Sequence, residues 1–248
     1  MNVGVTGVPD LLVLCGGQGT RLRPVLSDRP KSLAMIGSRP FIDLVLDPFL
    51  RQGIRRVILC TGHLGHQFEE WYADHPCLFD LTFSKEAVPQ GTAGAIAHAA
   101  QWMTSDPIVV ANGDSICEVD VAGLLAFHSK HQGCATVTLA SPDHRLDVGV
   151  VTINAQHRIS ALDEKKQNRS DGACNAGIYV FNRSALALIP RFRPCSLETD
   201  WLPLLIPMGV YGFASGAPLY DIGTPDRLGQ FRRETMEGKE PATRGRAC

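Results

Sequence analysis

The stretch LCGGQGTRLRP, from Leu14 to Pro24, decides the expected fold. It overlaps the end of a short apolar run, Leu11 to Cys15, and places three glycines ahead of Arg21. Such an apolar run predicts a buried strand. Glycine permits positive φ angles and lets bare backbone N–H groups approach an anion. A strand that leads into this bend therefore predicts an α/β protein with a phosphate-binding loop at a strand end.

Two common phosphate-binding motifs do not match the bend. The pattern G-x-x-x-x-G-K-[S/T] is absent from the chain. The dinucleotide pattern G-x-G-x-x-G fails because Leu22 stands where a third glycine must follow Gly17 and Gly19. Arg21 and, further on, Lys31 remain as the cations that could reach a polyphosphate held by this bend.

The composition limits the class of protein. A chain of 248 residues that is 44% hydrophobic predicts one large domain with an appended lobe. Its net charge of -1 gives no reason to expect binding to nucleic acid or to an anionic membrane surface. No apolar run approaches the roughly 20 residues of a membrane span. The eight cysteines show no C-x-x-C and no zinc spacing. We therefore expect a cytoplasmic protein with free thiols, no membrane partner and no nucleic-acid partner.

Apolar and amphipathic segments alternate along the chain, which predicts a Rossmann-like three-layer α/β sandwich with a mostly parallel mixed central sheet and a small strand-rich lobe. We expect one domain over residues 10–237, divided into 10–141 and 142–237, between tails at 1–9 and 238–248. Pro48 predicts a kink or an early break in the first helix. Helical spacing predicts helices over 40–52, 65–72, 92–103, 121–132, 183–189 and 197–206. Strands are expected at 11–15, 56–61, 81–86, 108–112, 135–141, 148–153, 159–163, 175–181, 209–213 and 219–221.

The glycine-rich bend also resembles a family signature. Gly16-Gly17-x-Gly19-Thr20-Arg21-Leu22, followed by Pro30-Lys31, is similar to the signature of the sugar-1-phosphate nucleotidylyltransferases. Later segments resemble the family's other motifs in the same order. These segments are Pro89 to Gly94, Asn112-Gly113-Asp114, Asp163-Glu164-Lys165, Asn175 to Tyr179, Ser196-Leu197-Glu198 and Tyr220 to Pro225. On this resemblance, residues 10–141 form the nucleotide-binding half and residues 142–237 the sugar-binding half.

The resemblance implies three sets of site residues. The implied catalytic residues are Arg21, Lys31, Asp114 and Asp221, and the two aspartates are also the implied ligands of a Mg²⁺ ion. The implied nucleotide-binding residues are Leu14, Gly16, Gly17, Gly19, Thr20, Arg21, Glu86, Gly91, Thr92 and Asn112. The implied sugar-phosphate-binding residues are Gly149, Glu164, Lys165, Asn175, Gly177 and Glu198.

The family's reaction suits a site without a nucleophilic triad. A sugar 1-phosphate is already an anion, so its oxygen attacks the α-phosphorus of a nucleoside triphosphate without a residue that removes a proton. Positioning and charge neutralisation then carry the catalysis. Magnesium suits carboxylate, phosphate and water oxygens, which matches the two aspartates. Arg21 would neutralise the departing pyrophosphate, Lys31 the reacting phosphates and Lys165 the attacking sugar phosphate.

The identity of the base depends on Glu86, which stands at a position that faces the base in this family. An ionised carboxylate only accepts hydrogen bonds, so it suits a base edge with adjacent donors. Guanine offers N1–H and its 2-amino group side by side, whereas thymine offers one N–H between two carbonyls. We therefore expect GTP, with ATP as the next alternative and dTTP or UTP after it.

The sugar is less well defined by the sequence. Cys15-Gly16-Gly17, Asn112 to Ser115 and the compact length resemble most the D-glycero-α-D-manno-heptose 1-phosphate guanylyltransferases, which feed capsule and other surface-polysaccharide pathways. The mannose-1-phosphate guanylyltransferases are the alternative. Lys166 and Val148 depart from many relatives close to the expected sugar. The family also implies a homodimer or a homotetramer.

Two other classes of protein remain as alternatives. A regulatory homologue would bind nucleotide or nucleotide sugar without turnover, but each charged position that the chemistry requires is present. A glycosyltransferase commonly carries Asp-x-Asp, which Asp114-Ser115-Ile116 does not supply. The histidine pairs His63/His66 and His128/His131 lack a third ligand at a motif spacing, which disfavours a zinc site.

Overall fold

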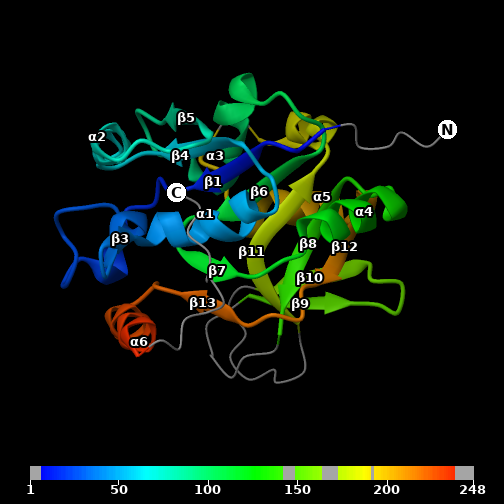
Figure 1. The fold of residues 1–248 in the computed structure, drawn as a ribbon. Helices are drawn as coiled ribbons and strands as arrows, with labels where there is room; N and C mark the ends of the chain where they lie inside the picture. Colours follow the sequence, from blue (N-terminus) through cyan, green and yellow to red (C-terminus); the bar gives the residue numbers. More distant parts are fainter. Residues whose placement is uncertain (1–6, 142–148, 164–172, 191–192, 238–248) are drawn as a thin grey trace.

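The protein is a three-layer α/β sandwich, described here from a computed structural model in which residues 7–141, 149–163, 173–190 and 193–237 are placed. A nine-stranded mixed sheet forms the middle layer, and helices cover both of its faces (Figure 1). The expected fold class is confirmed. The expected tails lie at 1–9 and 238–248, of which residues 1–6 and 238–248 are outside the described part.

Four parallel strands form the first half of the sheet. They are β1 (Leu11–Leu14), β4 (Arg56–Thr61), β5 (Asp80–Lys85) and β6 (Ile108–Asn112). Strand β1 is central, since it pairs in parallel with β4 on one side and with β6 on the other. Strand β5 continues the parallel order beyond β4. In a sheet of this kind, the carboxyl ends of the strands lie at one edge, where ligands bind.

The remaining strands extend the same sheet with mixed directions. They are β8 (Ala135–Ala140), β9 (Val150–Ile153), β10 (Ile159–Asp163), β11 (Ala173–Phe181) and β12 (Val210–Ala214). Strand β11 runs antiparallel to β6 and therefore joins the two halves of the chain in one sheet. Strand β8 pairs with β11 and, in parallel, with β12. The sequence predicted each of these strands to within two residues at either end.

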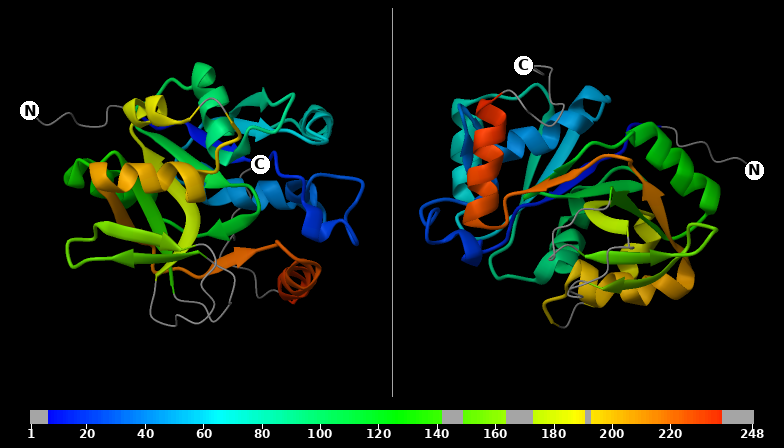
Figure 2. Two further views of the ribbon diagram at one scale, coloured as in Figure 1. Left: turned by 180° about the vertical axis from the view of Figure 1, so that it is seen from behind. Right: turned by 90° about the horizontal axis from the view of Figure 1, so that it is seen from below.

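Successive side chains of each strand point to opposite faces of the sheet and pack into two separate hydrophobic cores. Leu11 and Val13 of β1 point into one core, and Leu12 between them points into the other. The first core is covered by α1 (Phe41–Arg51), α2 (His66–Asp74), α4 (Val121–His131) and α6 (Pro225–Met236). The second core is covered by α3 (Gly91–Ala99) and α5 (Leu202–Gly209). Helix α1 lies in front of the sheet in Figure 1, and α5 comes to the front in the reverse view of Figure 2.

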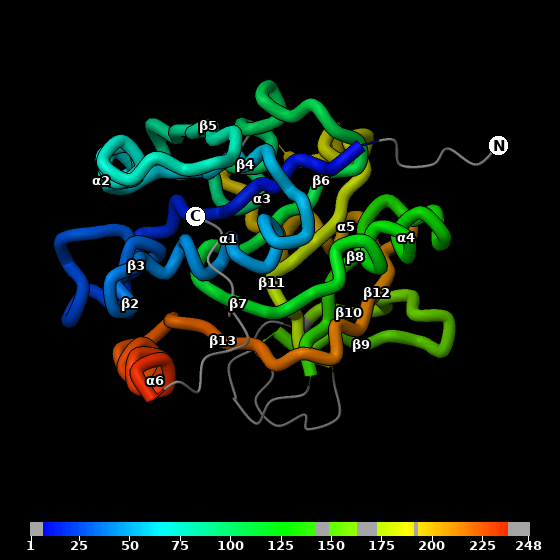
Figure 3. The backbone as a smooth tube through the Cα atoms, in the orientation of Figure 1, coloured from blue at the N-terminus to red at the C-terminus, as the bar shows by residue number. Residues whose placement is uncertain are grey.

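Two small sheets and five short helical turns complete the described fold. Strands β7 (Ser115–Cys117) and β13 (Leu219–Asp221) run antiparallel, side by side, and β13 leads into α6 (Figure 3). Strands β2 (Met35–Ile36) and β3 (Arg39–Pro40) form the other small sheet. The 3₁₀ turns are Thr20–Leu22, Lys31–Leu33, Ala100–Trp102 and Arg183–Leu188, and Leu197–Trp201 is a π-helical turn.

The expected break at Pro48 was wrong, because α1 continues through this residue to Arg51. Proline at this position removes one intrahelical hydrogen bond. Its neighbours Leu46 and Phe49 are 1% and 2% exposed, so the burial of this face compensates for the lost bond. The side-chain amide of Gln52 also donates to the Pro48 carbonyl over 2.9 Å and closes the last turn. The helix predicted at 183–189 is instead the 3₁₀ turn Arg183–Leu188, and the helix predicted at 197–206 begins with the π turn Leu197–Trp201 before α5.

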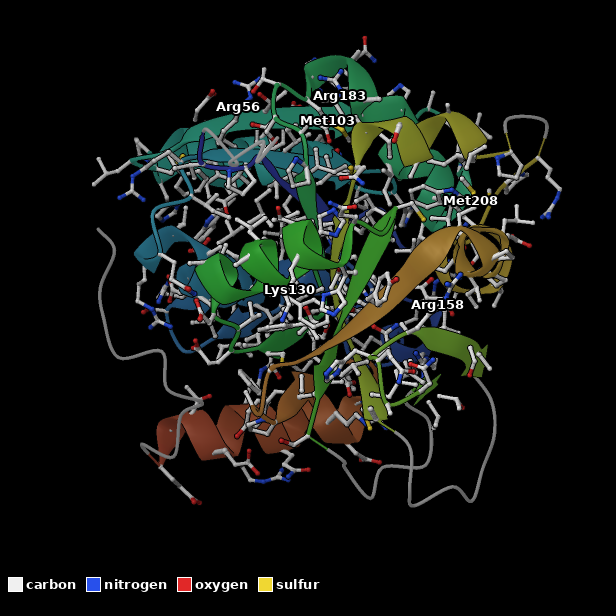
Figure 4. All side chains as sticks on the ribbon, turned by 90° about the vertical axis from the view of Figure 1, so that its right-hand side faces the viewer. Arg56, Met103, Lys130, Arg158, Arg183 and Met208 are labelled. Atoms are coloured by element: carbon white, nitrogen blue, oxygen red, sulfur yellow. The ribbon has the colours of Figure 1, made fainter. Side chains whose placement is uncertain are left out.

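Arginines bind carbonyl groups on the side of the molecule away from the glycine bend. Arg183 donates to the Met103 carbonyl over 3.1 Å, and Figure 4 shows the two residues next to each other. Arg158 donates to the Pro207 carbonyl over 2.9 Å, near the end of α5. The seven cysteines in the described part of the chain are free thiols, as predicted. None of the helices in the described ranges has the length and apolar character needed to cross a bilayer.

Candidate active site

A cavity of about 300 Å³ opens at the carboxyl ends of β1, β5 and β6. Its wall brings together residues that are far apart in the sequence, from Leu14 to Glu198. The predicted site residues in this wall are Leu14, Gly16, Gly17, Gly19, Lys31, Glu86, Gly91, Thr92, Asn112, Asp114 and Glu198. The structure therefore places most of the expected nucleotide-binding set around one hollow, together with two of the expected catalytic residues.

The glycine bend forms one side of the cavity. Gly19 has a φ of 57°, a left-handed conformation that glycine adopts without steric cost. It immediately precedes the 3₁₀ turn Thr20–Leu22, and the Leu22 amide donates to the Gly19 carbonyl over 2.9 Å. Thr20 and Arg21 lie outside the cavity wall. The bend thus turns the chain from the end of β1 toward the edge of the cavity.

Glu86 lies at one end of the cavity, directly after β5. Its amide donates to the Thr61 carbonyl over 2.9 Å, which fixes the backbone beside β4. Its carboxyl oxygen Oε1 is buried and has no hydrogen-bond partner among the described residues. Burial raises the pKa of this carboxyl to about 6, although a hydrogen bond from the Gln90 backbone opposes the shift. A buried acceptor without a partner is costly unless a ligand supplies a donor.

The loop that opens α3 is held by the second half of the chain. Gly91 has a φ of 78°, and a Cβ atom there would lie 2.4 Å from the Cys195 carbonyl oxygen. The Cys195 amide donates to the Gln90 carbonyl over 2.7 Å, and the Ala93 amide donates to the Cys195 carbonyl over 2.9 Å. No residue other than glycine fits at position 91 without movement of this backbone. The loop therefore depends on a segment more than a hundred residues further along the chain.

Glu198 links the two halves of the cavity wall through hydroxyl groups. The Tyr179 hydroxyl donates to Glu198 Oε1 over 3.1 Å, and it accepts from the Asn175 side-chain amide over 2.9 Å. The Thr92 hydroxyl donates to Glu198 Oε2 over 3.4 Å and accepts from the Leu197 amide over 2.6 Å. Asn175 and Glu198, both expected near the sugar phosphate, are thus connected through a fully buried tyrosine.

The other expected sugar contacts are placed by the backbone. A Cβ at Gly177 would lie 2.8 Å from the Asn112 side-chain nitrogen, so β11 approaches the end of β6 closely. Gly149 accepts from the Asn175 amide over 2.9 Å, beside the start of β9. Neither Gly149 nor Gly177 is in the cavity wall. Glu164 and Lys165 lie outside the described residues.

The charged residues gather on the β6 side of the site, and β1 and β4 lie between this side and β5, which Glu86 follows. Lys31 forms an ion pair with Asp114, which precedes β7. Asp221 ends β13 opposite Ser115 of β7, and the Ile222 amide donates to the Asp114 carbonyl over 3.2 Å. The pairing of β7 with β13 therefore brings the two expected metal-binding aspartates onto neighbouring backbone segments.

Asp221 is itself held by a second cation. Both of its carboxyl oxygens accept from Arg227 Nη1, over 3.0 and 3.1 Å. The Gly223 amide donates to Asp221 Oδ1 over 2.8 Å. A Cβ at Gly223 would lie 3.5 Å from Arg21 Nη2, so the Arg21 guanidinium lies at the same point. This end of the site, which we call the phosphate end, comprises Arg21, Lys31, Asp114, Asp221 and Arg227.

Three residues of the site were assigned no role from the sequence, although one of them, Tyr179, ends the motif Asn175 to Tyr179. Tyr179 and Arg227 act through partners, and the residue type alone gave no signal for either. Ser32 was also missed, although it is buried and lines the cavity beside Lys31. Within the described ranges, no group of three or more His, Cys, Asp or Glu side chains is arranged to hold a metal. Any ion at the two aspartates would therefore take its other ligands from water or substrate.

Comparison with known protein families identifies the class of protein. The model of the nucleotidyl transferase family matches residues 11–236, and the chain belongs to this family. It is therefore a nucleotidyltransferase. The structure resembles that of HddC from Yersinia pseudotuberculosis, solved with GMP-PN, with a TM-score of 0.80 and 26% identity over 92% of this chain and 99% of that chain. An inositol-1-phosphate CTP transferase from T. maritima, 18% identical with a TM-score of 0.78 over 95% of this chain and 98% of that chain, shares the fold.

Two sequence relatives have more specific names. A mannose-1-phosphate guanylyltransferase from Mycobacterium tuberculosis is 33% identical over 95% of this chain and 67% of its own length. A D-glycero-alpha-D-manno-heptose 1-phosphate guanylyltransferase from Aneurinibacillus thermoaerophilus is 31% identical over 91% of this chain and 97% of its own length. The chain spans 53–61% of several further mannose-1-phosphate relatives.

Proposed function

We propose that the protein is a sugar-1-phosphate guanylyltransferase, which transfers GMP from GTP to a sugar 1-phosphate and releases pyrophosphate. The observation that carries the base assignment is the buried, unpartnered carboxyl oxygen of Glu86 in the cavity wall. Guanine supplies two adjacent N–H donors to an ionised carboxylate, and thymine does not. The guanylyltransferase names of both relatives and the GMP-PN complex of HddC agree with this choice.

The phosphate end suits the transfer step. The ionised oxygen of the sugar 1-phosphate forms the new bond to the α-phosphorus while the bond to the β-phosphate oxygen breaks, and no residue has to remove a proton. In this proposal Lys31 neutralises the reacting phosphates and Arg21 the departing pyrophosphate. Charge partners that are already in place need no reorganisation during the reaction.

Asp114 and Asp221 would hold a magnesium ion. Mg²⁺ binds through one or two carboxylates and completes its shell with water and phosphate oxygens, which fits a site with two carboxylates on neighbouring segments. When bound, the ion neutralises charge on the α-phosphate. The protein itself orients the substrates. The glycine bend and α3 would orient the nucleotide, and Glu198 with Asn175 would orient the sugar.

For the sugar we propose D-glycero-α-D-manno-heptose 1-phosphate. Cys15-Gly16-Gly17 and the segment Asn112 to Ser115 resemble the heptose-specific enzymes most, and a relative with that name is 31% identical over 91% of this chain. Mannose 1-phosphate is the second candidate because the mannose-specific relative has the higher identity. These compounds share the ring configuration and differ in the side chain at the far end of the sugar, so the same phosphate end would serve both.

A matrix of substrates tests the proposal. GTP, ATP, CTP, UTP and dTTP are each incubated with the heptose, mannose and glucose 1-phosphates and Mg²⁺, and pyrophosphate is measured. We expect turnover with GTP, and the highest kcat/KM with the heptose phosphate. A preference for dTTP or UTP would contradict the role of Glu86. Binding of GTP without pyrophosphate release from any of the sugars would favour a regulatory protein.

A further inference from the structure

The ion pair between Asp221 and Arg227 is not explained by the local chemistry of α6. Thr224 is the N-cap of this helix and its hydroxyl accepts from the Arg227 amide over 3.4 Å, which makes Arg227 the third helical residue. Glutamate or glutamine is favoured there, since it can bond back to the N-cap amide. A cation in the first helical turn also opposes the helix dipole. An arginine at this position therefore weakens the helix start.

The side chain of Arg227 is instead directed to Asp221. Its Nη1 lies 3.0 and 3.1 Å from the two carboxyl oxygens. The two side chains are only 20% and 14% exposed, so solvent screens this pair less than a surface pair. Arg227 thus neutralises the carboxylate in the position where the proposed function needs a ligand for a divalent ion.

The same point in space is close to Arg21. A Cβ at Gly223 would lie 3.0 Å from Asp221 Oδ1, 3.5 Å from Arg21 Nη2 and 3.8 Å from Arg227 Nη1. A divalent ion at Asp221 would add two further positive charges beside these guanidinium groups. Like charges at such distances repel, so Arg227 and the ion compete for Asp221.

We propose that Arg227 is a positioning residue that occupies Asp221 in place of the divalent ion and is displaced when the ion binds. This inference rests on the proposed function, since it assumes that Asp221 is a metal ligand. Before the ion arrives, Arg227 and the Gly223 amide hold the carboxylate in one orientation. Afterwards the guanidinium of Arg227 lies beside Arg21, in reach of substrate phosphate oxygens.

The expected consequence is that wild-type protein binds a free divalent ion weakly. Lys31 pairs with Asp114 in the same way, so both proposed ligands are already neutralised. A triphosphate brings enough negative charge to attract the displaced cations. The ion is therefore expected to enter with the nucleotide rather than before it.

Manganese binding provides the test, since Mn²⁺ replaces Mg²⁺ at oxygen ligands and free Mn²⁺ is counted by electron paramagnetic resonance. The full-length protein is titrated with and without guanosine 5′-(α,β-methylene)triphosphate. Arg227→Met is expected to bind Mn²⁺ about fivefold more tightly than wild type in both titrations, because a competing ion pair has been removed. Arg227→Lys keeps the competing charge and should stay within about twofold of wild type. Arg233→Met, on an exposed part of the same helix, is the matched control.

The outcomes separate this inference from the proposed function. If Arg227 only anchored Asp221 structurally, Arg227→Met would weaken Mn²⁺ binding, and that result or an unchanged affinity would overturn the displacement. Asp221→Asn is titrated in parallel and should weaken Mn²⁺ binding. If Asp221→Asn has no effect, the metal site of the proposed function fails as well. Thermal unfolding of Arg227→Met and Arg227→Lys verifies that both variants are folded.

Discussion

The two ends of the cavity use carboxylates in opposite ways. At the base end, Glu86 has a buried oxygen with no partner among the described residues, and burial raises the pKa of this carboxyl. At the phosphate end, Asp114 and Asp221 are each paired with a cation, Lys31 and Arg227 respectively. The same functional group is thus prepared for different ligands. A carboxylate without a neighbouring cation can accept hydrogen bonds from the neutral N–H groups of a base. A carboxylate in an ion pair can exchange its side-chain cation for a metal ion.

This contrast also separates specificity from catalysis. Loss of a carboxylate at the phosphate end removes charge from the reacting centre, which affects every nucleotide. Loss of the carboxylate at the base end should affect one base more than the others.

Asp114→Asn and Asp221→Asn should each lower the rate of pyrophosphate release at least about 100-fold, the scale of losing a preorganised charge partner. The amide is nearly isosteric, so the fold should be retained, and circular dichroism checks this. Asp226→Asn, an exposed neighbour in the first turn of α6, should keep nearly normal turnover. Near-normal turnover in both site variants would refute the two-aspartate site.

Glu86→Gln should reduce kcat/KM for GTP about 30-fold, because the new amide N–H₂ faces one of the two guanine donors. The kcat/KM for ATP should change far less, so the ratio of kcat/KM for GTP to that for ATP should fall. Steady-state kinetics with both nucleotides measure this ratio. Glu69→Gln on α2, outside the cavity wall, serves as the control. An equal loss for GTP and ATP would mean that Glu86 does not contact the base.

Binding of GTP should weaken at acidic pH. The pKa of Glu86 is raised to about 6, so the protonated form dominates below that value, and this form cannot accept both guanine N–H groups. KM for GTP should be constant above about pH 7 and rise as the pH falls below the pKa of Glu86, toward the roughly 30-fold limit expected for the neutral side chain of Glu86→Gln. Glu86→Gln should lose this dependence. The same rise in the variant would assign it to another group.

Tyr179→Phe should raise KM for the sugar phosphate about fivefold with a smaller change in KM for GTP, because one bridging hydroxyl between Asn175 and Glu198 is lost. The partly buried Asn175 amide would lose its acceptor, so the melting temperature should also fall slightly. Tyr211→Phe, whose ring packs against His131 outside the cavity wall, is the comparison variant. An unchanged KM for the sugar phosphate in Tyr179→Phe would remove this hydroxyl from the sugar site.

The sequence predicted the parts of the site that depend on local order. Leu14 ends β1 and Cys15 to Gly19 follow it directly, while Asn112 ends β6, the parallel neighbour of β1, so the sheet brings these residues together. Glu86, which the resemblance placed at the base, was expected to end a strand over 81–86; it lies one residue after β5, in the cavity wall. The resemblance added Asp221 and Glu198, whose distance along the chain from β1 gives no hint of proximity.

The remaining features depend on tertiary packing. Tyr179 lies on a strand pattern that predicts only burial, and its hydroxyl acquires a role through Glu198 nineteen residues later. Arg227 lies on an amphipathic helix, where an arginine normally faces solvent. At Pro48 the local rule predicted a break, but the burial of its neighbours Leu46 and Phe49 outweighed it. In each case a contact or burial that exists only in the folded chain, and not the residue type, decided the outcome.

The backbone hydrogen bonds between Cys195 and the loop that opens α3 have a consequence for how the two substrates bind. Hydrogen bonds connect residues 90–93 with residues 195–198. The wall expected around the base and the wall expected around the sugar are therefore one connected structure. A ligand that orders one of these segments also orders the other, so a second ligand costs the protein less conformational entropy when it binds. We therefore expect positive cooperativity: each substrate should bind more tightly when the other is already bound.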